Sequence, residues 1–277
     1  MPSASLQEIV EYRGVEGLVA AEVTHDENDA TGYTTGPVFA IAGVAEISKT
    51  TDSSSETHYY DNIPAVVVSN TSSDTVTITA SAIPFDVLAT LTGQVYDSAT
   101  GSYIEGVRQQ KYFAIGYKAK KTNGDEVYVW RFKGSFNVPD QTNSTENDST
   151  DANGQELVFT GISTTHKFSK TGKGAKALNV DVAKNLADVS SFFSAVTTPD
   201  TLQAKTAYTL TITEDTGTSV SVLRNGIALE TGAAIFAGDI LIISVTGGTI
   251  TVNTEAFVSG QALVVTGNVA VVSTASD

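Results

Sequence analysis

Two aromatic segments joined by a short polar connection constrain the fold of this chain more than any other feature. They occupy residues 113–117 (FAIGY) and 128–136 (YVWRFKGSF), and residues 118–125 connect them. Asn123-Gly124-Asp125 ends the connection with residues that tolerate positive φ, so the chain can reverse direction there with little strain. The pattern predicts an antiparallel hairpin.

The second segment has two chemically different faces, because side chains alternate along a strand. One face carries the aromatic side chains of Tyr128, Trp130 and Phe132. The other face carries Val129, Arg131 and Lys133. We expect the aromatic face to pack inward and the other face to meet water or a neighbouring subunit. Arg131 and Lys133 are therefore candidate oligomerisation residues.

The composition favours a mainly β protein. Of the 277 residues 41% are hydrophobic, which is typical of a globular chain, and Val, Ile, Thr and Ser are abundant at the expense of Leu and Met. The length allows one large domain or two ordinary ones. We expect two.

The charge balance argues against tight binding of nucleic acid. Sixteen Lys and Arg stand against 31 Asp and Glu, which gives a net charge of -15. Such a chain cannot neutralise many phosphates, whereas an acidic surface repels DNA and lets it slide past.

Neither disulfides nor thiolate metal sites are available, because the chain has no cysteine. The start of the chain lacks a basic stretch followed by an apolar one, and no run of about 18 apolar residues follows. We expect a protein made and assembled in the cytoplasm, without a membrane span.

Further strands are predicted on either side of a polar segment. Alternating or branched apolar residues indicate strands at 16–23, 38–47, 66–69, 75–80 and 155–164. Residues 48–57 (SKTTDSSSET) are polar and too numerous for a tight turn, so we expect a long loop that contacts another subunit. Its candidate oligomerisation residues are Ser48, Thr51, Asp52, Ser54 and Glu56.

Two helices are predicted to flank the strands. Residues 84–92 place apolar side chains at three-residue spacing, with Pro84 at the start and Gly93 as the stop. Residues 181–196 place apolar side chains at steps of four, three and four, and Pro199 ends that segment. Tyr59 and Tyr60 are interpreted as core side chains before a strand-end turn at Asp61-Asn62.

Beyond Pro199 the pattern changes to short strands separated by Gly- and Asn-containing turns. Basic residues divide 14 before Pro199 and 2 after it, and acidic residues divide 24 and 7, so the two parts carry -10 and -5. We predict domains at 1–198 and 199–277, the second a small β-sandwich.

No catalytic or metal-binding motif is apparent. His25, His58 and His166 are distant in sequence and are interpreted as structural, and the acidic residues 26–29 as a solvated turn rather than a calcium loop. The basic residues 167–176 lack the spacing of a phosphate-binding loop and are interpreted as a flexible basic loop. We expect no enzyme activity, no metal and no cofactor.

The order of several short motifs resembles that of the major tail proteins, or tail tube proteins, of long-tailed bacteriophages with non-contractile tails. The resemblance covers about residues 10–198. It is carried by Gly17-Leu18, Tyr60-Asp61-Asn62, Asp86-Val87 with Leu91-Thr92-Gly93, residues 113–117, residues 130–136 and residues 188–196.

The resemblance implies a tail-tube domain of two packed antiparallel sheets with flanking helices, six copies of which form a ring. Stacked rings would make the tube of a virion tail assembled in the host cytoplasm. The implied partners are further copies of the chain, the tape measure protein, tail-end proteins and double-stranded DNA in transit. The loop at residues 48–57 would reach a neighbouring ring or subunit.

Residues 199–277 lie outside the resemblance and look like an Ig-like decoration domain, for which weak contact with the host surface is an open alternative. For the whole chain the alternative function is a modular bacterial surface adhesin. That protein would need a secretion signal and an anchor, and the sequence shows neither.

Overall fold

The computed structural model describes residues 9–140 and 154–276, apart from the side chains of Ser54 and of residues 68–71. The chain forms two compact units. The N-terminal unit comprises the described part of Met1–Lys184 together with Val189–Leu202, and the C-terminal unit comprises Asn185–Asp188 and the described part of Gln203–Asp277. Both units are built mainly from β-strands, as the composition predicts.

The N-terminal unit contains eleven strands, an α-helix and a 3-10 helix in its described residues. These elements are β1 (Tyr12–Asp26), β2 (Tyr33–Thr35), β3 (Phe39–Ala40), β4 (Val44–Tyr60), β5 (Ile63–Ala80), α1 (Phe85–Thr92), β6 (Val95–Asp97), β7 (Ser102–Ile104), β8 (Phe113–Lys121), β9 (Glu126–Phe136), β10 (Gln155–Ile162), β11 (Ala177–Asp181) and η1 (Val182–Lys184).

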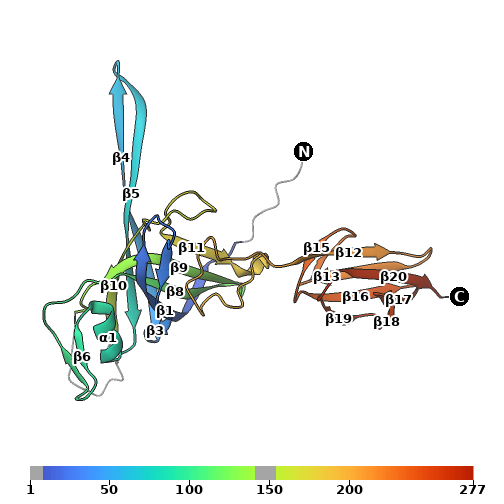
Figure 1. Ribbon diagram of the computed structural model, residues 1–277. Helices are drawn as coiled ribbons and strands as arrows, with labels where there is room; N and C mark the ends of the chain where they lie inside the picture. The colour runs from blue at the N-terminus through green and yellow to red at the C-terminus, as the bar shows by residue number, and fades with distance from the viewer. Residues whose placement is uncertain (1–8, 141–153, 277) are drawn as a thin grey trace, which may run out of the picture. The chain divides into compact units, whose positions relative to one another are not determined.

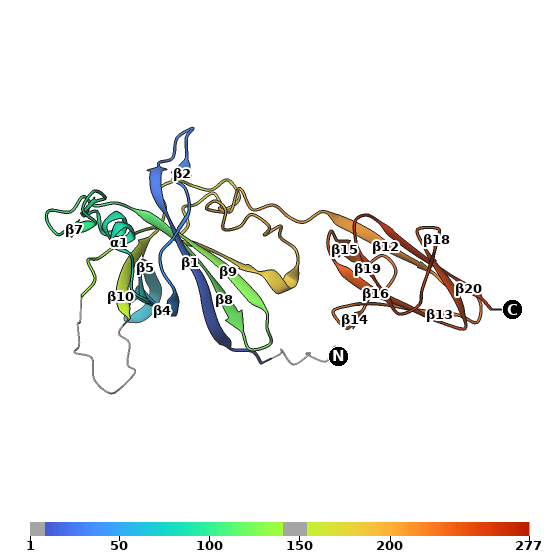
Figure 2. The ribbon, with the colours of Figure 1, turned by 90° about the horizontal axis from the view of Figure 1, so that it is seen from below.

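One nine-stranded sheet organises this unit (Figures 1 and 2). Its main order is β2-β1-β8-β9-β10-β5-β4, with β3 paired to β1 and β11 paired to β9. All of these pairings are antiparallel. Strand β4 lies at one end of the order, whereas β6 and β7 form a separate pair.

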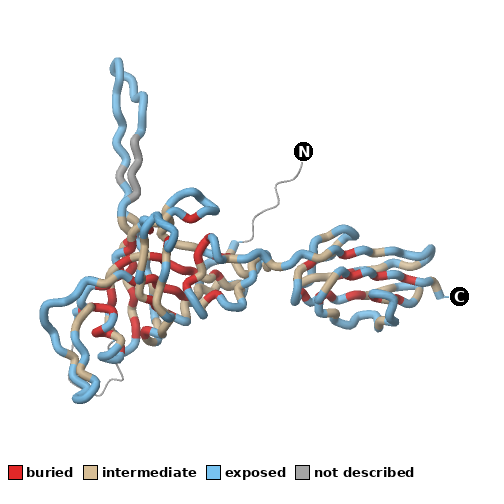
Figure 3. Tube along the Cα trace, viewed as in Figure 1, coloured by how far each residue is buried: buried red, intermediate tan, exposed pale blue. Residues whose placement is uncertain are grey.

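The hydrophobic core of the unit includes Phe113, Ile115, Leu157 and Phe159, which are fully buried. The predicted strand at 155–164 is confirmed as β10, and its alternate residues are buried. Helix α1 adds Leu88 and Leu91 to the same cluster. Figure 3 shows the buried residues gathered in the body of the unit, whereas the described part of the β4–β5 hairpin that extends beyond the sheet is mostly exposed.

The predicted aromatic hairpin is confirmed as β8 and β9. The expectation that the face of Val129, Arg131 and Lys133 meets water or a neighbouring subunit is not confirmed. Val127 and Val129 belong to the core cluster, and Arg131 is only 8% exposed. The aromatic face packs against a second layer of aromatic side chains contributed by Tyr33, Phe168, Phe192 and Phe193. Both faces of β9 are therefore covered within the same unit, because the segment after β11 folds back over the aromatic side.

Helix α1 confirms the first predicted helix. Gly93 ends it in the left-handed conformation, with φ of 70°, and donates to the carbonyl oxygen of Ala89. The second predicted helix is wrong: residues 181–196 contain only the single 3-10 turn η1 followed by irregular turns. Asn185 takes a φ of 53°, which ends the helical path, and Ala187 bridges to Ala204 as a strand would. Among the described residues, α1 is the one α-helix.

The prediction of a loop at residues 48–57 is also wrong. These residues belong to β4, and their partners lie on β5, from Ser48 opposite Thr77 to Thr57 opposite Val67. The strands predicted at 66–69 and 75–80 are parts of β5. Ser and Thr side chains made the segment look like a loop, but its backbone groups are satisfied by the ladder.

The C-terminal unit consists of two sheets that share one core. The first has the order β15-β12-β20-β17-β18 and the second β14-β13-β16-β19. The strands are β12 (Ala207–Thr213), β13 (Ser219–Arg224), β14 (Ile227–Ala228), β15 (Ala234–Phe236), β16 (Ile240–Thr246), β17 (Gly248–Val252), β18 (Glu255–Phe257), β19 (Gln261–Val264) and β20 (Val269–Ala275). Leu210, Leu241 and Val271 are fully buried between them.

Candidate assembly interface

The β4–β5 hairpin extends beyond the sheet as an isolated two-stranded arm (Figure 1). Strand β10 pairs with β5 only from Ala80 to Asp74, whereas β4 and β5 pair on to Tyr60 opposite Ile63. The free part of β5 would span roughly 35 Å at about 3.3 Å per residue. Because a lone two-stranded hairpin is marginally stable in water, this arm is expected to need a partner.

The tip of the arm is apolar on both faces. The turn at its end is formed by Asp61 and Asn62, with φ values of 53° and 62°, as expected for a tight hairpin turn. The interpretation of Tyr59 and Tyr60 as core residues is wrong, because both are about two-thirds exposed. The exposed side chains that form the apolar tip are Tyr59 66%, Tyr60 64%, Ile63 64%, Val66 47% and Val67 62%.

The sequence-predicted contact residues lie along the shaft of the arm rather than at its tip. Ser48, Asp52 and Glu56 are exposed and Thr51 is half-buried, while the side chain of Ser54 lies outside the described part of the structure. Asp52 accepts a hydrogen bond of 3.4 Å from Ser73 across the two strands. Polar contacts of this kind keep the shaft soluble, whereas the apolar tip has no such cover.

A buried ionic cluster fixes the base of the arm. Asp74 lies where β5 leaves the sheet, and its carboxylate accepts from Arg131 at 3.0 Å and from Lys176 at 3.1 Å. Its side chain is 7% exposed. Burial is the largest single influence and raises the pKa of Asp74, but the hydrogen bonds from Lys176 and Thr51 and the nearby positive charges together outweigh it, so the pKa lies below its usual value. The cluster links β5, β9 and the segment before β11.

Lys133 also has a partner inside the unit. Its ammonium lies 2.6 Å from Asp26, which in addition accepts from the backbone N–H groups of Thr165 and His166. Burial opposes ionisation of Asp26, but these hydrogen bonds prevail and hold its pKa below the usual value. Arg131 and Lys133 therefore each have an ionic partner within their own unit.

Two edges of the large sheet are unpaired in the described residues. Strand β4 pairs only with β5, and β1 has no partner beside Tyr12–Glu16 on the side away from β8. A groove of about 450 Å³ lies between these edges. It is lined by Tyr12, Val15, Glu46, Ile47, Tyr117 and Val129, among others. Open edges of this kind favour pairing with another strand.

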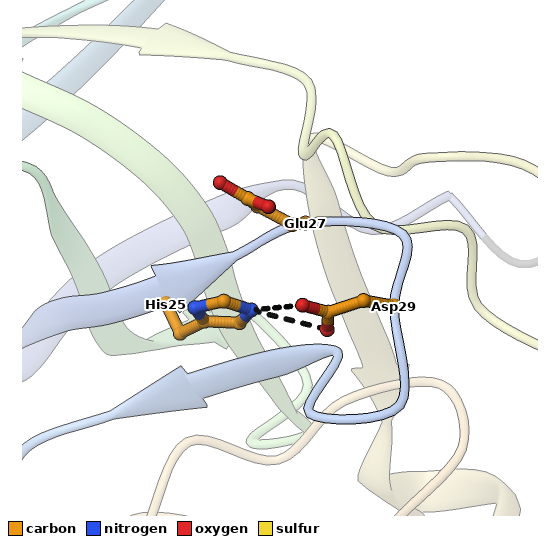
Figure 4. Close-up of side chains that lie close together, drawn as sticks. All are labelled: His25, Glu27 and Asp29. Atoms are coloured by element: carbon orange, nitrogen blue, oxygen red, sulfur yellow. Dashed lines mark hydrogen bonds and ion pairs between the residues drawn. The ribbon is translucent and has the colours of Figure 1, made fainter.

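The turn after β1 brings together three side chains that the sequence pattern indicates separately, as a structural histidine and as part of a solvated acidic turn. Ligand atoms of His25, Glu27 and Asp29 lie within 4.8 Å of one another (Figure 4). The Asp29 carboxylate accepts from His25 at 3.1 Å and from the backbone N–H groups of Thr31 and Gly32 at 2.9 Å. These bonds account for the cluster as a closed turn at the surface, so we assign no metal to it.

The basic segment at residues 167–176, interpreted from the sequence as a flexible loop, is an ordered turn. Phe168 and Lys173 form a β-bridge, and the N–H groups of Ser169 and Lys170 donate to the carboxylate of Asp200. Lys176 belongs to the ionic cluster at Asp74. The backbone donors here are therefore occupied by a carboxylate of the same unit.

None of the helices in the described residues is long and apolar enough to cross a membrane. A family model described as "Phage tail tube protein" matches residues 27–198. The match includes the whole arm, the aromatic hairpin and α1, and it ends before β12. No curated protein matches the chain.

Proposed function

Because the chain belongs to the phage tail tube protein family, we propose that it is the repeating subunit of a long, non-contractile tail tube built from stacked hexameric rings. Membership of the family makes the chain a structural component of a phage tail that assembles into a tube with other tail components. The hexameric ring, the non-contractile tail and assembly in the host cytoplasm are parts of the proposal.

The arm is the single observation that best supports the proposal. It combines a polar shaft with an exposed apolar tip, and it is paired with no third strand in the described residues. A monomer gains nothing from such an element, because its tip leaves large apolar side chains in water. A stacked assembly uses the arm to join one ring to the next, with Ser48, Thr51, Asp52, Ser54 and Glu56 along the contact.

The open sheet edges support closure within a ring. Strand β4 of one subunit and β1 of its neighbour would bring together the two unpaired edges of the large sheet. Repetition around a ring then produces a continuous barrel, which leaves no edge exposed to further chains.

The channel of the tube would conduct double-stranded DNA during ejection and hold the tape measure protein before that. The net charge of -15 favours a negatively charged channel wall, along which DNA is repelled and slides. Proteins at the ends of the tube complete the proposed set of partners. A ring with a basic channel would contradict this part of the proposal.

The C-terminal unit would decorate the tube as an Ig-like domain. Its two sheets enclose a core of their own, and its strands lie outside the family match. Weak contact between this unit and the host surface is part of the proposal. The adhesin alternative receives no support from the family match.

Sedimentation and negative-stain microscopy of the purified protein test the proposed function. We expect rings or tubes on the order of 100 Å wide, the size of a multi-strand barrel with an outer layer. A variant in which Ser-Gly replaces residues 55–67 should form no stacked tubes, although single rings can still close through the sheet edges, and its thermal transition should be unchanged. A wild-type protein that stays monomeric at every concentration and salt would contradict the proposal.

A further inference from the structure

A second exposed apolar surface lies beside α1. We call it the α1 patch, and its members are Phe85 51%, Val95 60%, Tyr96 38%, Ile104 52% and Val107 104% exposed. Val95 and Ile104 are direct partners in the β6–β7 pair, so they share one face. A hollow of about 600 Å³ adjoins the patch, lined by Val95, Tyr96, Val107 and Lys111 with residues of α1.

The α1 patch is held in place by specific contacts. The backbone N–H of Gln109 donates a hydrogen bond of 2.9 Å to the carbonyl oxygen of Gly93. The backbone N–H of Gly106 donates one of 2.8 Å to the side-chain oxygen of Gln94. A side chain at residue 93 could not fit, because its Cβ would lie 1.8 Å from the oxygen of Gln109. Val107 is thus presented to solvent by a segment tied at both sides to the end of α1.

The arm and the α1 patch lie at opposite ends of the N-terminal unit. Figure 1 shows the β4–β5 arm leaving one end of the sheet and α1 with β6 at the other end. In Figure 2 the unit is seen from the side of α1 and β7, with β4 and β5 behind them. A contact between two different surfaces at opposite ends repeats without closing, which produces a linear stack.

We propose that the apolar tip of the arm of one copy docks against the α1 patch of a second copy. This inference rests on the proposed function and names the acceptor surface for the arm. Both surfaces expose aromatic and branched side chains that a single copy leaves in water. The contact buries the tip side chains Tyr60 and Ile63 against Val95 and Val107.

Charge supports the pairing of these two surfaces. Residues 50–73 contain Asp52, Glu56 and Asp61 but no Lys or Arg. Lys111 and Asp86 both line the hollow beside the α1 patch, and Lys111 is paired with Glu22 at 3.0 Å, whereas Arg108 lies next to Val107. The guanidinium of Arg108 has five N–H donors. One of them donates to the carbonyl oxygen of Phe136. The carboxylate of Asp61 at the tip turn can therefore meet the guanidinium of Arg108 beside Val107.

Cysteine crosslinking tests the contact directly, because the natural chain contains no cysteine. The double variant Tyr60→Cys with Val107→Cys is assembled and treated with a short bis-maleimide. We expect a ladder of crosslinked oligomers, since every copy then offers one donor and one acceptor. Each single variant alone should give no ladder. The control pair Tyr60→Cys with Asn123→Cys, in which the exposed β8–β9 turn replaces the patch, should give none either.

The outcomes separate the inference from the proposed function. If the double variant assembles into tubes but only the control pair crosslinks, or if Val107→Cys alone forms dimers, the acceptor is wrong while the tube stands. If the wild-type chain forms no tubes, the proposed function and the inference fail together.

A charged substitution in the patch provides a second test. Val107→Asp should raise the concentration needed for assembly at least about tenfold, as loss of a central apolar contact does. The thermal transition should be unchanged, because Val107 is fully exposed within the subunit. Val107→Thr, which keeps the shape without the charge, should assemble within a few-fold of the wild type. Equal assembly of Val107→Asp and wild type would overturn the inference.

Discussion

The indole nitrogen of Trp130 donates a hydrogen bond of 2.8 Å to the backbone carbonyl oxygen of Phe192. Both residues are buried, and the bond joins the centre of the aromatic hairpin to the irregular segment that folds over it. An aromatic layer surrounds the bond, with Tyr128 and Phe193 in contact at 5.1 Å between ring centres. The hairpin is therefore the central layer of the N-terminal unit.

Replacing Trp130 with Ala should destabilise the N-terminal unit by about 3–5 kcal/mol, the usual cost of emptying a large aromatic site. Tube formation should fail with it. Trp130→Phe keeps most of the packing and should therefore cost less than Trp130→Ala. Loss of the buried hydrogen bond should still cost about 1–3 kcal/mol. Calorimetry of the two variants measures the difference. Normal stability and normal tubes from Trp130→Ala would show that this residue is not central.

Gly116 should not accept a methyl group. A Cβ at this position would lie 3.0 Å from three carbon atoms of the Trp130 indole, which is itself fixed by its hydrogen bond. Gly116→Ala should cost about 1–3 kcal/mol, as overpacking does. Gly14→Ala is the matched control, since its Cβ would meet only Lys120 at 3.8 Å. Urea denaturation followed by circular dichroism compares them, and equal midpoints would contradict the prediction.

The ionic cluster at Asp74 should make the N-terminal unit sensitive to acid. The pKa of Asp74 is lower in the folded state than its usual value, so its ionisation stabilises the fold above the unfolded-state pKa of about 3.9. That stability is lost as the pH falls from there through the lower, folded-state pKa. Trp130 is the only tryptophan, so its fluorescence reports unfolding of this unit.

Asp74→Asn should lose about 3–5 kcal/mol at neutral pH, because Arg131 and Lys176 are left without their carboxylate. Its stability should also fall less steeply than that of the wild type when the pH drops below about 4. Asp52→Asn, on the exposed shaft of the arm, is the control at neutral pH. Parallel acid profiles for Asp74→Asn and wild type would contradict the assigned role.

The arm tip should matter for assembly and not for folding. Ile63→Asp introduces a charge at a side chain that is 64% exposed, so we expect an unfolding free energy within about 0.5 kcal/mol of wild type. Assembly should fall at least about tenfold, since the tip is the buried centre of the proposed contact. Ile63→Val is the control. Sedimentation measures assembly, and a loss of folding together with assembly would place Ile63 in the core instead.

Patterns with a strong local cause could be predicted from the sequence. The aromatic period of β9, the buried alternation of β10 and the glycine stop of α1 are all local, and each is confirmed. The apparent helix at 181–196 was not predictable in its true form, because it depends on a distant partner. The carbonyl oxygen of Phe192 bonds to Trp130, a residue more than sixty positions away in the chain.

The candidate site could be located only in part. The polarity of residues 48–57 favours a loop and conceals a strand, since backbone pairing does not depend on apolar side chains. The pair Tyr59-Tyr60 favours a core position in a sequence, because exposed aromatic side chains are uncommon in a monomer, yet both are exposed here. Arg131 and Lys133 looked free because their acidic partners, Asp74 and Asp26, lie far away in sequence.

A cryo-electron microscopy reconstruction of the assembled protein tests the central claim most directly. The account predicts a tube of stacked six-membered rings in which the β4–β5 arm of each subunit crosses into the next ring. Assemblies in which the arm stays within its own ring, or in which the subunits form no closed ring at all, would contradict it.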